Sequence, residues 1–281
     1  MINIIQSVVL IILFLTTAGV SEHFILNRMS GRRISGIRGL TIEIRNALFA
    51  KYTFTEYLII SAYIAVALLN SSHNNLFLPN VKCMELLFAL ILLPFCYGYL
   101  VYGKSKMIES RRFNINMLIF LSNGLVFSSI TALFLNTHGL DYISSAVFIQ
   151  QNGYSSWFVS QDPLNFALSA ISIFAFAGFS PFGGISYEND FQLAYEEKTT
   201  EGLLWLLSRL FRYSLFVFFT NLFLGGASGI FQMLVKLIII NTFYTMVSSL
   251  FPKMRIRENF TFNLAMLLIL MISFLTYGGI F

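Results

Sequence analysis

Long apolar runs recur along almost the whole chain, and they constrain its fold more than any other feature of the sequence. A helix needs about 20 apolar residues to cross a bilayer. Runs close to that length cover residues 2–21, 53–70, 83–103, 113–136, 163–180, 203–225, 228–250 and 260–280. Because lipid offers the backbone no hydrogen bonds, such segments cross membranes as helices. We therefore predict an all-α integral membrane protein with about eight transmembrane helices.

The composition leaves little room for anything else. Of the 281 residues, 57% are hydrophobic and only 11% are charged, whereas soluble domains contain roughly 25% charged residues. No separate soluble domain of ordinary size fits between the runs, so we predict a single polytopic membrane domain over residues 1–281. The first run lacks the basic start of a secretory signal and is followed by the basic "SEHFILNRMSGRR", so we expect a retained first span.

The cysteines and histidines lack the spacing of a metal or redox site. Cys83 and Cys96 lie in one apolar run, about 20 Å apart along a helix, which is too far for a disulfide. The histidines, His23, His73 and His138, are scattered along the chain. We therefore expect no metal ion and no haem bound by this chain.

Basic residues alternate between the loops that connect the runs. They occur in the first, third and seventh loops, and the second, fourth and sixth loops have none. Because cytoplasmic loops carry an excess of Lys and Arg, we expect the odd-numbered loops in the cytoplasm and both termini outside.

The fifth loop differs from the other cytoplasmic loops because it is acidic. The segment "PFGGISYENDFQLAYEEKTTEG", residues 181–202, has Lys198 as its only basic residue. Its five carboxylates are Glu188, Asp190, Glu196, Glu197 and Glu201. Neither solubility nor orientation requires them, and clustered carboxylates raise one another's pKa, so they can take up protons. The alternative is an ordinary solvated loop.

Two loops are predicted to contain helices of their own. In "GIRGLTIEIRNALFAKY", residues 36–52, Leu40, Ile44 and Leu48 share one helical face, which indicates an amphipathic helix at the membrane surface. The long fourth loop is rich in aromatic and small residues, and we expect a short surface helix there too.

A few polar residues fall inside the predicted spans. Arg209 and Arg212 share one helical face, and Lys236 lies about two turns from either end of its run. Such charges face a polar interior or extend to the interface. For Arg209 the alternative is that its side chain extends to the membrane interface. Lys236 is the better candidate for a charge that belongs to a buried chain of polar groups. We expect Asn123 and Asn221 to form hydrogen bonds between helices.

Three segments, in this order, resemble the quinone-chamber membrane subunit of complex I, the bacterial NADH:quinone oxidoreductase. They also resemble its counterparts in energy-converting and formate hydrogenlyase-type hydrogenases. The first is "EHFILNRMSGRR", which matches the family pattern at Glu22, Arg28, Gly31 and Arg32. Further on, Glu43 falls where the family has an Asp that opens its amphipathic helix.

The other two segments lie in the fifth and seventh loops. The acidic loop aligns with the family at Pro181, Phe182, Glu188, Asp190, Tyr195 and, after one inserted residue, Gly202. The "SSLFPKMRIRE" before the last span is similar to the hydrogenase-type pattern at Pro252, Met254, Arg255 and Arg257. Lys236 falls where those relatives often have a Lys.

The chain also departs from the family pattern. Ile34 and Ser35 replace the G-P that follows the basic pair, and the P-F-D-x-P core of the fifth loop reads Pro-Phe-Gly-Gly-Ile. The acids that the family carries in spans four and five correspond to Asn123 and Gly178. An amide and a glycine cannot hold and release a proton, so two carriers of the family's proton path are missing.

The resemblance implies a membrane-anchor subunit of a complex I-like oxidoreductase or an energy-converting (group 4) hydrogenase. Such a subunit docks the peripheral redox arm and couples electron transfer to proton or ion movement, and the chain alone is not expected to be catalytic. The implied chamber and docking residues are Glu22, Arg28, Arg32, Arg33, Arg38, Glu43 and Arg45. The implied charge-coupling residues are Glu188, Asp190, Glu196, Glu197, Glu201, Arg209, Arg212 and Lys236.

The resemblance also implies partners and a location. We expect no directly bound cofactor, a quinone as the one candidate ligand, and Fe–S clusters or a nickel site in partner subunits. The expected partners are peripheral Fe–S and hydrogenase-like or quinone-reductase subunits, antiporter-like membrane subunits and the lipid bilayer, with no nucleic acid. The expected location is the bacterial or archaeal cytoplasmic membrane, as part of a respiratory chain.

Two other classes of protein remain open from the sequence. A stand-alone carrier of small ions or solutes would have polar residues or helix breaks near the middle of several spans, but most spans here are uniformly apolar. A membrane-embedded lipid-modifying enzyme would need clustered Asp or His near the inner face. The fifth-loop carboxylates lack the repeated D-x-x-x-D or H-x-x-x-x-D spacing of such enzymes.

Overall fold

The structure is helical throughout its described part. It is a computed structural model, and it describes residues 2–29, 45, 52–71, 81–104, 110–152, 156–179, 181–182, 198–227, 229–252 and 254–277. The α-helices are α1 (Ile2–Met29), α3 (Phe54–Ser71), α4 (Cys83–Lys104), α5 (Ser110–Thr137), α6 (Ile143–Ile149), α7 (Phe158–Gln161), α8 (Pro163–Phe176), α9 (Lys198–Phe223), α10 (Ile230–Leu250) and α11 (Ile256–Tyr277). The 3-10 helix η1 covers Gln150–Asn152. These residues contain no β-strand, so the predicted all-α membrane fold is confirmed.

Each of the eight apolar runs forms a helix, and α8 is the shortest of these eight helices. Within the described residues, six helices are long and apolar enough to cross a membrane: α1, α3, α5, α9, α10 and α11. Helix α4 is 22 residues long, whereas α8 is shorter than a membrane span. The 14 residues of α8 extend about 21 Å, less than the roughly 30 Å of a hydrocarbon layer.

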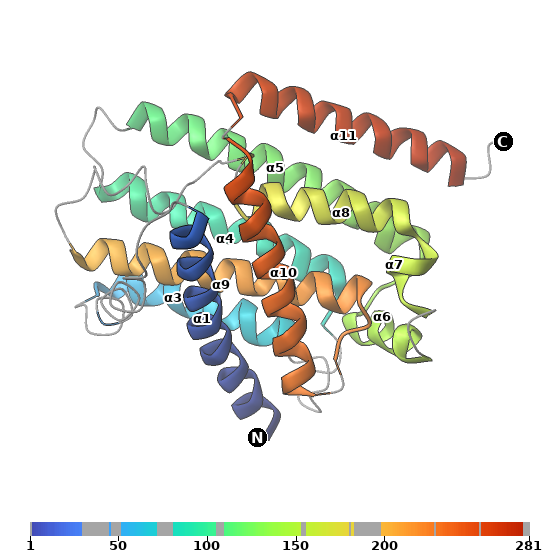
Figure 1. Ribbon diagram of the computed structural model, residues 1–281, viewed down its shortest axis with the longest axis horizontal. Helices are drawn as coiled ribbons and strands as arrows, with labels where there is room; N and C mark the ends of the chain where they lie inside the picture. Colours follow the sequence, from blue (N-terminus) through green and yellow to red (C-terminus); the bar gives the residue numbers. More distant parts are fainter. Residues whose placement is uncertain are drawn as a thin grey trace.

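Helix α9 forms the centre of the molecule. In its segment Gly202–Phe223, 89% of the residues are buried, compared with 28% in the spans of α10 and α11. It contacts α1, α3, α4, α6, α7, α8 and α10. In Figure 1, α9 crosses the molecule behind α1 and α10, which stand at a steep angle to it. An interior helix of this kind is apolar on all sides, and the few charges that it carries must find partners.

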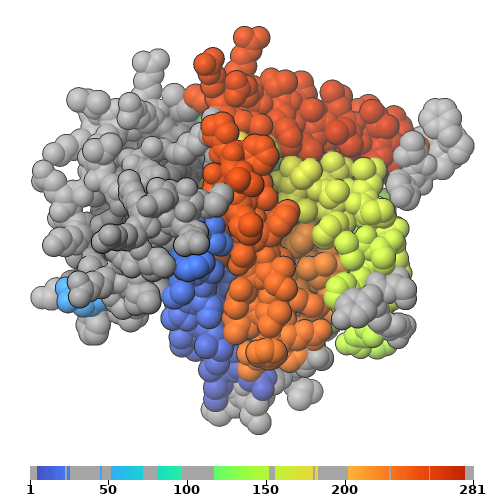
Figure 2. Space-filling model, viewed as in Figure 1, coloured from blue at the N-terminus to red at the C-terminus, as the bar shows by residue number. Residues whose placement is uncertain are grey.

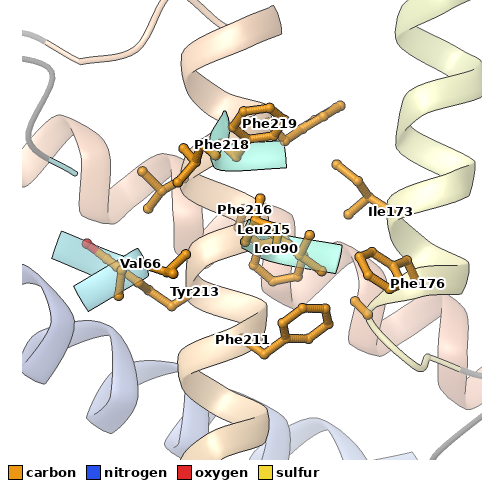
Figure 3. Packing of buried hydrophobic residues seen from close by; sticks show 14 of the residues in the cluster. Val66, Leu90, Ile173, Phe176, Phe211, Tyr213, Leu215, Phe216, Phe218 and Phe219 are labelled. Atoms are coloured by element: carbon orange, nitrogen blue, oxygen red, sulfur yellow. The ribbon is translucent and has the colours of Figure 1, made fainter. Parts of the chain in front are cut away.

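Aromatic side chains fill the space around α9. Figure 3 shows Phe211 and Phe216 of α9 among Leu90 of α4 and Ile173 and Phe176 of α8. The ring centroids of Phe176 and Phe211 are 5.1 Å apart with an interplanar angle of 87°, the edge-to-face geometry that aromatic pairs favour. These contacts fix α8 against α9, and they place the end of α8 beside the middle of α9.

The outer helices keep large apolar faces. On the face shown in Figure 2, α1 and α10 lie side by side. The exposed large side chains on α10 and α11 include Ile239, Phe243, Met246, Leu264, Leu268 and Ile272. In a membrane protein these faces contact lipid or neighbouring subunits.

Turn residues set the ends of α5 and α8. Gly139, with φ +61°, follows α5, and the Leu140 N–H donates to the Leu135 carbonyl at 2.9 Å. Gly178, with φ +77°, follows α8 in the same way. Both glycines adopt the left-handed conformation that commonly closes a helix and that strains residues with a side chain.

The predicted loop helices have different outcomes. The fourth loop does contain short helices, α6, η1 and α7, and they pack against α9 instead of lying freely on the surface. The predicted amphipathic helix at 36–52 lies outside the described residues, except for Arg45 and Tyr52. Arg45 is helical and exposed.

Candidate functional site

A buried ionic cluster joins α1 to α9. Oε1 of Glu22 lies 2.5 Å from Nη1 of Arg209, and Oε2 lies 3.4 Å from Nη1 of Arg212. The side chains of Glu22, Arg209 and Arg212 are 5%, 2% and 13% exposed, respectively. Two guanidinium groups thus surround one carboxylate in an apolar interior, where an unpaired charge is very costly. We call these residues the ionic cluster; it carries one excess positive charge.

Arg212 extends the ionic cluster to a third helix. Its Nε donates to the carbonyl of Ala177, at the C-terminal end of α8, at 3.3 Å. Its guanidinium also lies 4.4 Å from the centre of the Phe179 ring. A cation near a helix C-terminus and over an aromatic face is favourable on both counts. Arg212 therefore connects the position of Glu22 to the end of α8.

The burial of Arg209 excludes one explanation offered by the sequence. Its side chain is fully enclosed, so it does not extend to the membrane interface. The helical spacing of Arg209 and Arg212 correctly predicted a shared face. It could not identify Glu22 as their partner, because Glu22 belongs to the first span and nothing in the sequence pattern pairs α1 with α9.

Amide side chains hold the C-terminal half of α9. Asn70 of α3 donates to the Ser214 carbonyl, and Asn221 donates to the Asn70 carbonyl at 3.1 Å. The expected interhelical hydrogen bond of Asn221 is confirmed. Asn70 lies at the end of α3 and was not predicted to contribute.

Gln150 ties the fourth loop to the end of α9. Its Nε2 donates to the carbonyls of Asn221 and Leu222 at 3.2 and 2.9 Å. Its Oε1 accepts from the N–H groups of Phe158 and Gly225 at 3.2 and 3.0 Å. Every donor and acceptor here is buried or partly buried, so Gln150 is a structural centre. It was missed from the sequence because a glutamine in a loop has no distinguishing pattern.

The side chain of Lys236, a residue of α10, reaches the C-terminal end of α9. Its Nζ donates to the carbonyls of Leu224 and Gly226, both at 2.6 Å, and lies 4.3 Å from the centre of the Trp157 ring. Carbonyls at a helix C-terminus carry partial negative charge, so the lysine stabilises this end of α9. The structure therefore places Lys236 apart from the ionic cluster. We use the name amide end for the group formed by Asn70, Gln150, Asn221 and Lys236.

The positions where the resemblance places membrane acids have structural roles here. Asn123 donates to the Ala175 carbonyl at 3.1 Å and accepts from Asn263 at 2.8 Å, so it links α5, α8 and α11 as predicted for an interhelical amide. Gly178 forms the left-handed turn after α8. Neither residue can carry a proton.

The structure also brings two of the resemblance segments into contact. The Pro181 carbonyl, at the start of the acidic loop, accepts from the Met254 N–H at 2.7 Å. The Phe182 carbonyl accepts from Asn259 at 3.0 Å, and the Phe182 ring centre lies 4.5 Å from that of Phe262. The start of the acidic loop is therefore held against the segment that opens α11.

Most of the remaining predicted site residues lie outside the described part of the chain. These are Arg32, Arg33, Arg38, Glu43, Glu188, Asp190, Glu196 and Glu197. Arg28 lies in α1 and Glu201 lies in the first turns of α9, and the described contacts do not include their side chains. Among the described residues, no group of three or more His, Cys, Asp or Glu side chains could hold a metal ion.

Comparison with known proteins gives a similar fold. No family model matches the sequence, and no curated protein matches it. The fold is similar to that of a chain in the membrane-bound sulfane sulfur reductase, an archaeal respiratory membrane complex, with a TM-score of 0.66 and 18% sequence identity. The similarity covers 94% of this chain and 95% of that one. At this identity the likeness establishes a shared fold over nearly the full length.

Proposed function

We propose that this chain is the membrane-anchor subunit of a respiratory oxidoreductase complex of the complex I or energy-converting hydrogenase kind. The observation that carries the proposal is the ionic cluster, a charged group buried where α1, α8 and α9 meet. The three segments similar to the quinone-chamber family of complex I support it. The full-length fold likeness to a chain of a respiratory membrane complex supports it as well.

In this proposal the ionic cluster responds to charge at the docked redox arm. The five carboxylates of residues 188–201 and the basic first loop form the docking side, and α9 leads from there directly to Arg209 and Arg212. A change of charge at the arm alters the balance between the two guanidinium groups that share Glu22. Because Arg212 also holds the end of α8, this balance is transmitted to the contact between α8 and α9.

Electrons would stay in partner subunits. The chain has only two cysteines, in separate positions of one span, so Fe–S clusters and a nickel site belong to the peripheral partners. Within the proposed class, "FPKMRIRE" and the missing G-P favour the hydrogenase-type branch over the quinone-reducing branch. The departures at Asn123 and Gly178 mean that ion movement would have to use groups other than the family's acids in spans four and five.

Purification from the native membrane tests the assembly. The tagged full chain is extracted in mild detergent, and co-purifying proteins are identified by mass spectrometry. We expect an Fe–S subunit, a large hydrogenase-like or quinone-reductase-like subunit, and antiporter-like chains. A lone monomer or homo-oligomer, under conditions that keep other membrane complexes intact, would overturn the proposal and favour a stand-alone carrier.

A matched pair of variants then tests the ionic cluster. Glu22→Gln removes the shared carboxylate, and Glu85→Gln removes a carboxylate that is 69% exposed in α4. We expect the Glu22→Gln complex to retain its peripheral subunits and to lose ion movement in vesicles, while Glu85→Gln behaves like the unmodified complex. Equal ion movement in both variants would exclude a coupling role for the ionic cluster.

A further inference from the structure

An open groove lies along α5, between α4 and α11. Helix α5 contacts both of these helices, and α11 runs beside it (Figure 1). The groove has a volume of about 610 Å³, which is within the range of small-ligand sites. Its apolar walls include Met84, Leu133, Leu267, Leu270, Met271 and Phe274. We call this hollow the α5 groove.

The body of the α5 groove is apolar and open to the surroundings of the protein. Met84 and Met271 are 53% and 60% exposed. Ser129 also lines the groove, but its hydroxyl donates to the Leu125 carbonyl at 2.8 Å and needs no other partner. From residue 267 to residue 274 the α11 wall extends about 10 Å, a third of the roughly 30 Å hydrocarbon layer. These walls match the upper part of a lipid acyl chain.

One end of the α5 groove is polar. Asn136, in the last turn of α5, and Asp141, beyond that helix, line this end. The backbone holds Asp141 in place, because its carbonyl accepts from the Cys83 N–H at 2.8 Å and the neighbouring Tyr142 forms an antiparallel bridge with Lys82. Since α5 ends here and α4 begins here, this rim lies at the level of the lipid head groups.

The charge at the rim selects among lipids. Asp141 is exposed, and it forms no ion pair with a described residue, since the nearby Lys82 pairs with Glu85 at 3.8 Å. An ammonium group would complement this carboxylate, whereas a purely anionic head group would be repelled by it. The Asn136 side-chain amide can donate to a phosphate. The rim therefore offers one partner for each end of a zwitterionic head group.

We propose that the α5 groove binds one phospholipid whose head group carries an amine, of the phosphatidylethanolamine type. An acyl chain lies along α5 between Met84 and Met271, whose flexible side chains adapt to it. The ammonium contacts Asp141, and the phosphate contacts Asn136. A helix of a partner subunit is the alternative occupant, and it would have to bring a Lys or Arg to Asp141. The inference does not depend on the proposed oxidoreductase role.

Lipid titration tests the proposal. The full chain is purified in mild detergent and depleted of lipid by washing, and dioleoyl phosphatidylethanolamine or dioleoyl phosphatidylglycerol is added. Native mass spectrometry counts the bound lipids, and thermal unfolding is followed in parallel. We expect one phosphatidylethanolamine to bind about tenfold more tightly than phosphatidylglycerol, because only its amine can donate to the Asp141 carboxylate. It should also raise the unfolding midpoint, as a ligand of the folded state does. Equal affinity for the two lipids would overturn the proposal.

Variants assign the binding to the α5 groove. Asp141→Asn should abolish the preference for phosphatidylethanolamine, whereas Glu85→Gln, at an exposed acid outside the groove, should keep it. Ala132→Phe places a large side chain in the groove and should weaken the binding of both lipids. Its control is Ala265→Phe, at an exposed alanine of α11 outside the groove, which should bind them normally. An unchanged preference in Asp141→Asn, or unchanged binding in Ala132→Phe, would overturn the proposal.

A second measurement locates the lipid on the unmodified chain. Phosphatidylethanolamine with a photoreactive group in one acyl chain is crosslinked to the protein in detergent, at one probe molecule per chain, and the labelled peptides are identified by mass spectrometry. We expect labelling at residues 129–136 and 267–274, and excess phosphatidylethanolamine should suppress it more than excess phosphatidylglycerol. Equal labelling of the exposed faces of α1 and α10 would overturn the proposal, even if a groove variant failed to fold. In the native membrane assembly, a groove crosslinked to a neighbouring protein and to no lipid would assign it to a partner helix and overturn the proposal as well.

Discussion

The middle of α9 and its C-terminal half are held by different kinds of interaction. At the ionic cluster, one carboxylate is shared between two guanidinium groups, and one of them also holds the end of α8. At the amide end, neutral amides and one lysine bind backbone carbonyls and N–H groups. A carboxylate shared by two guanidinium groups can move closer to one of them and away from the other. Directed bonds to the backbone permit one geometry, so the amide end fixes α9 while the ionic cluster can respond to charge.

Substitutions in the ionic cluster and in the amide end should differ in their cost in free energy. Breaking a buried ion pair deprives a charged group of its close, charge-assisted contact in an apolar interior, whereas replacing an amide leaves only neutral groups unpaired. The ionic cluster and the amide end should therefore differ in their sensitivity to single substitutions. The variants below test that difference by the free energy of unfolding in detergent.

The largest effect is expected for Arg209→Gln. The substitution leaves Glu22 with Arg212 alone, at 3.4 Å, and should lower the free energy of unfolding by about 3–5 kcal/mol. The control is Arg257→Gln, an exposed residue in α11, which should change it by no more than about 0.5 kcal/mol. Similar small losses in both variants would mean that the ionic cluster contributes nothing to stability.

Gln150→Leu should have the next largest effect. It leaves the buried N–H of Phe158 and the half-buried N–H of Gly225 without their acceptor, and we expect a loss of about 2–4 kcal/mol. The same substitution at the neighbouring exposed Gln151 provides the control and should be nearly neutral. If Gln151→Leu were equally destabilising, the effect would come from the apolar substitution in this loop and not from the lost bonds.

Lys236→Met should cost less. It removes the two bonds to the Leu224 and Gly226 carbonyls and the contact with Trp157, and we expect a loss of about 1–2 kcal/mol. Lys82→Met, at an exposed lysine, should have almost no effect. A loss for Lys236→Met as large as that for Arg209→Gln would erase the distinction between the ionic cluster and the amide end.

The smallest effect is expected for Asn221→Leu. Interhelical hydrogen bonds in membranes contribute about 0.6–1.7 kcal/mol, and we expect a loss in that range. Because Asn221 donates to the backbone of Asn70 and Asn70 in turn donates to α9, combining Asn221→Leu with Asn70→Leu should cost less than the sum of the single losses. Strict additivity would show that the two amides act independently.

Much of this fold follows from the sequence, and the pairing of its helices does not. Apolar length predicted the helices, and helical spacing placed Arg209 and Arg212 on one face. Single polar residues in apolar runs correctly indicated hydrogen bonds at Asn123 and Asn221. Which spans meet depends on the packing of side chains in three dimensions, so the partnership of Glu22 with α9 could not be predicted. Gln150 was missed for the same reason, since its partners Asn221, Leu222 and Gly225 lie in another part of the chain.

The central position of α9 has a consequence for the biogenesis of this protein. A chain is synthesised from its N-terminus, so α1 enters the membrane long before α9 exists. Glu22 must then wait until Arg212, 190 residues later, has left the ribosome before both of its partners are available. During that interval the carboxylate needs a temporary counter-ion, a proton or a protective chaperone, because an unpaired charge in lipid is costly. Insertion of α9 is therefore the step that first brings both partners of Glu22 to α1.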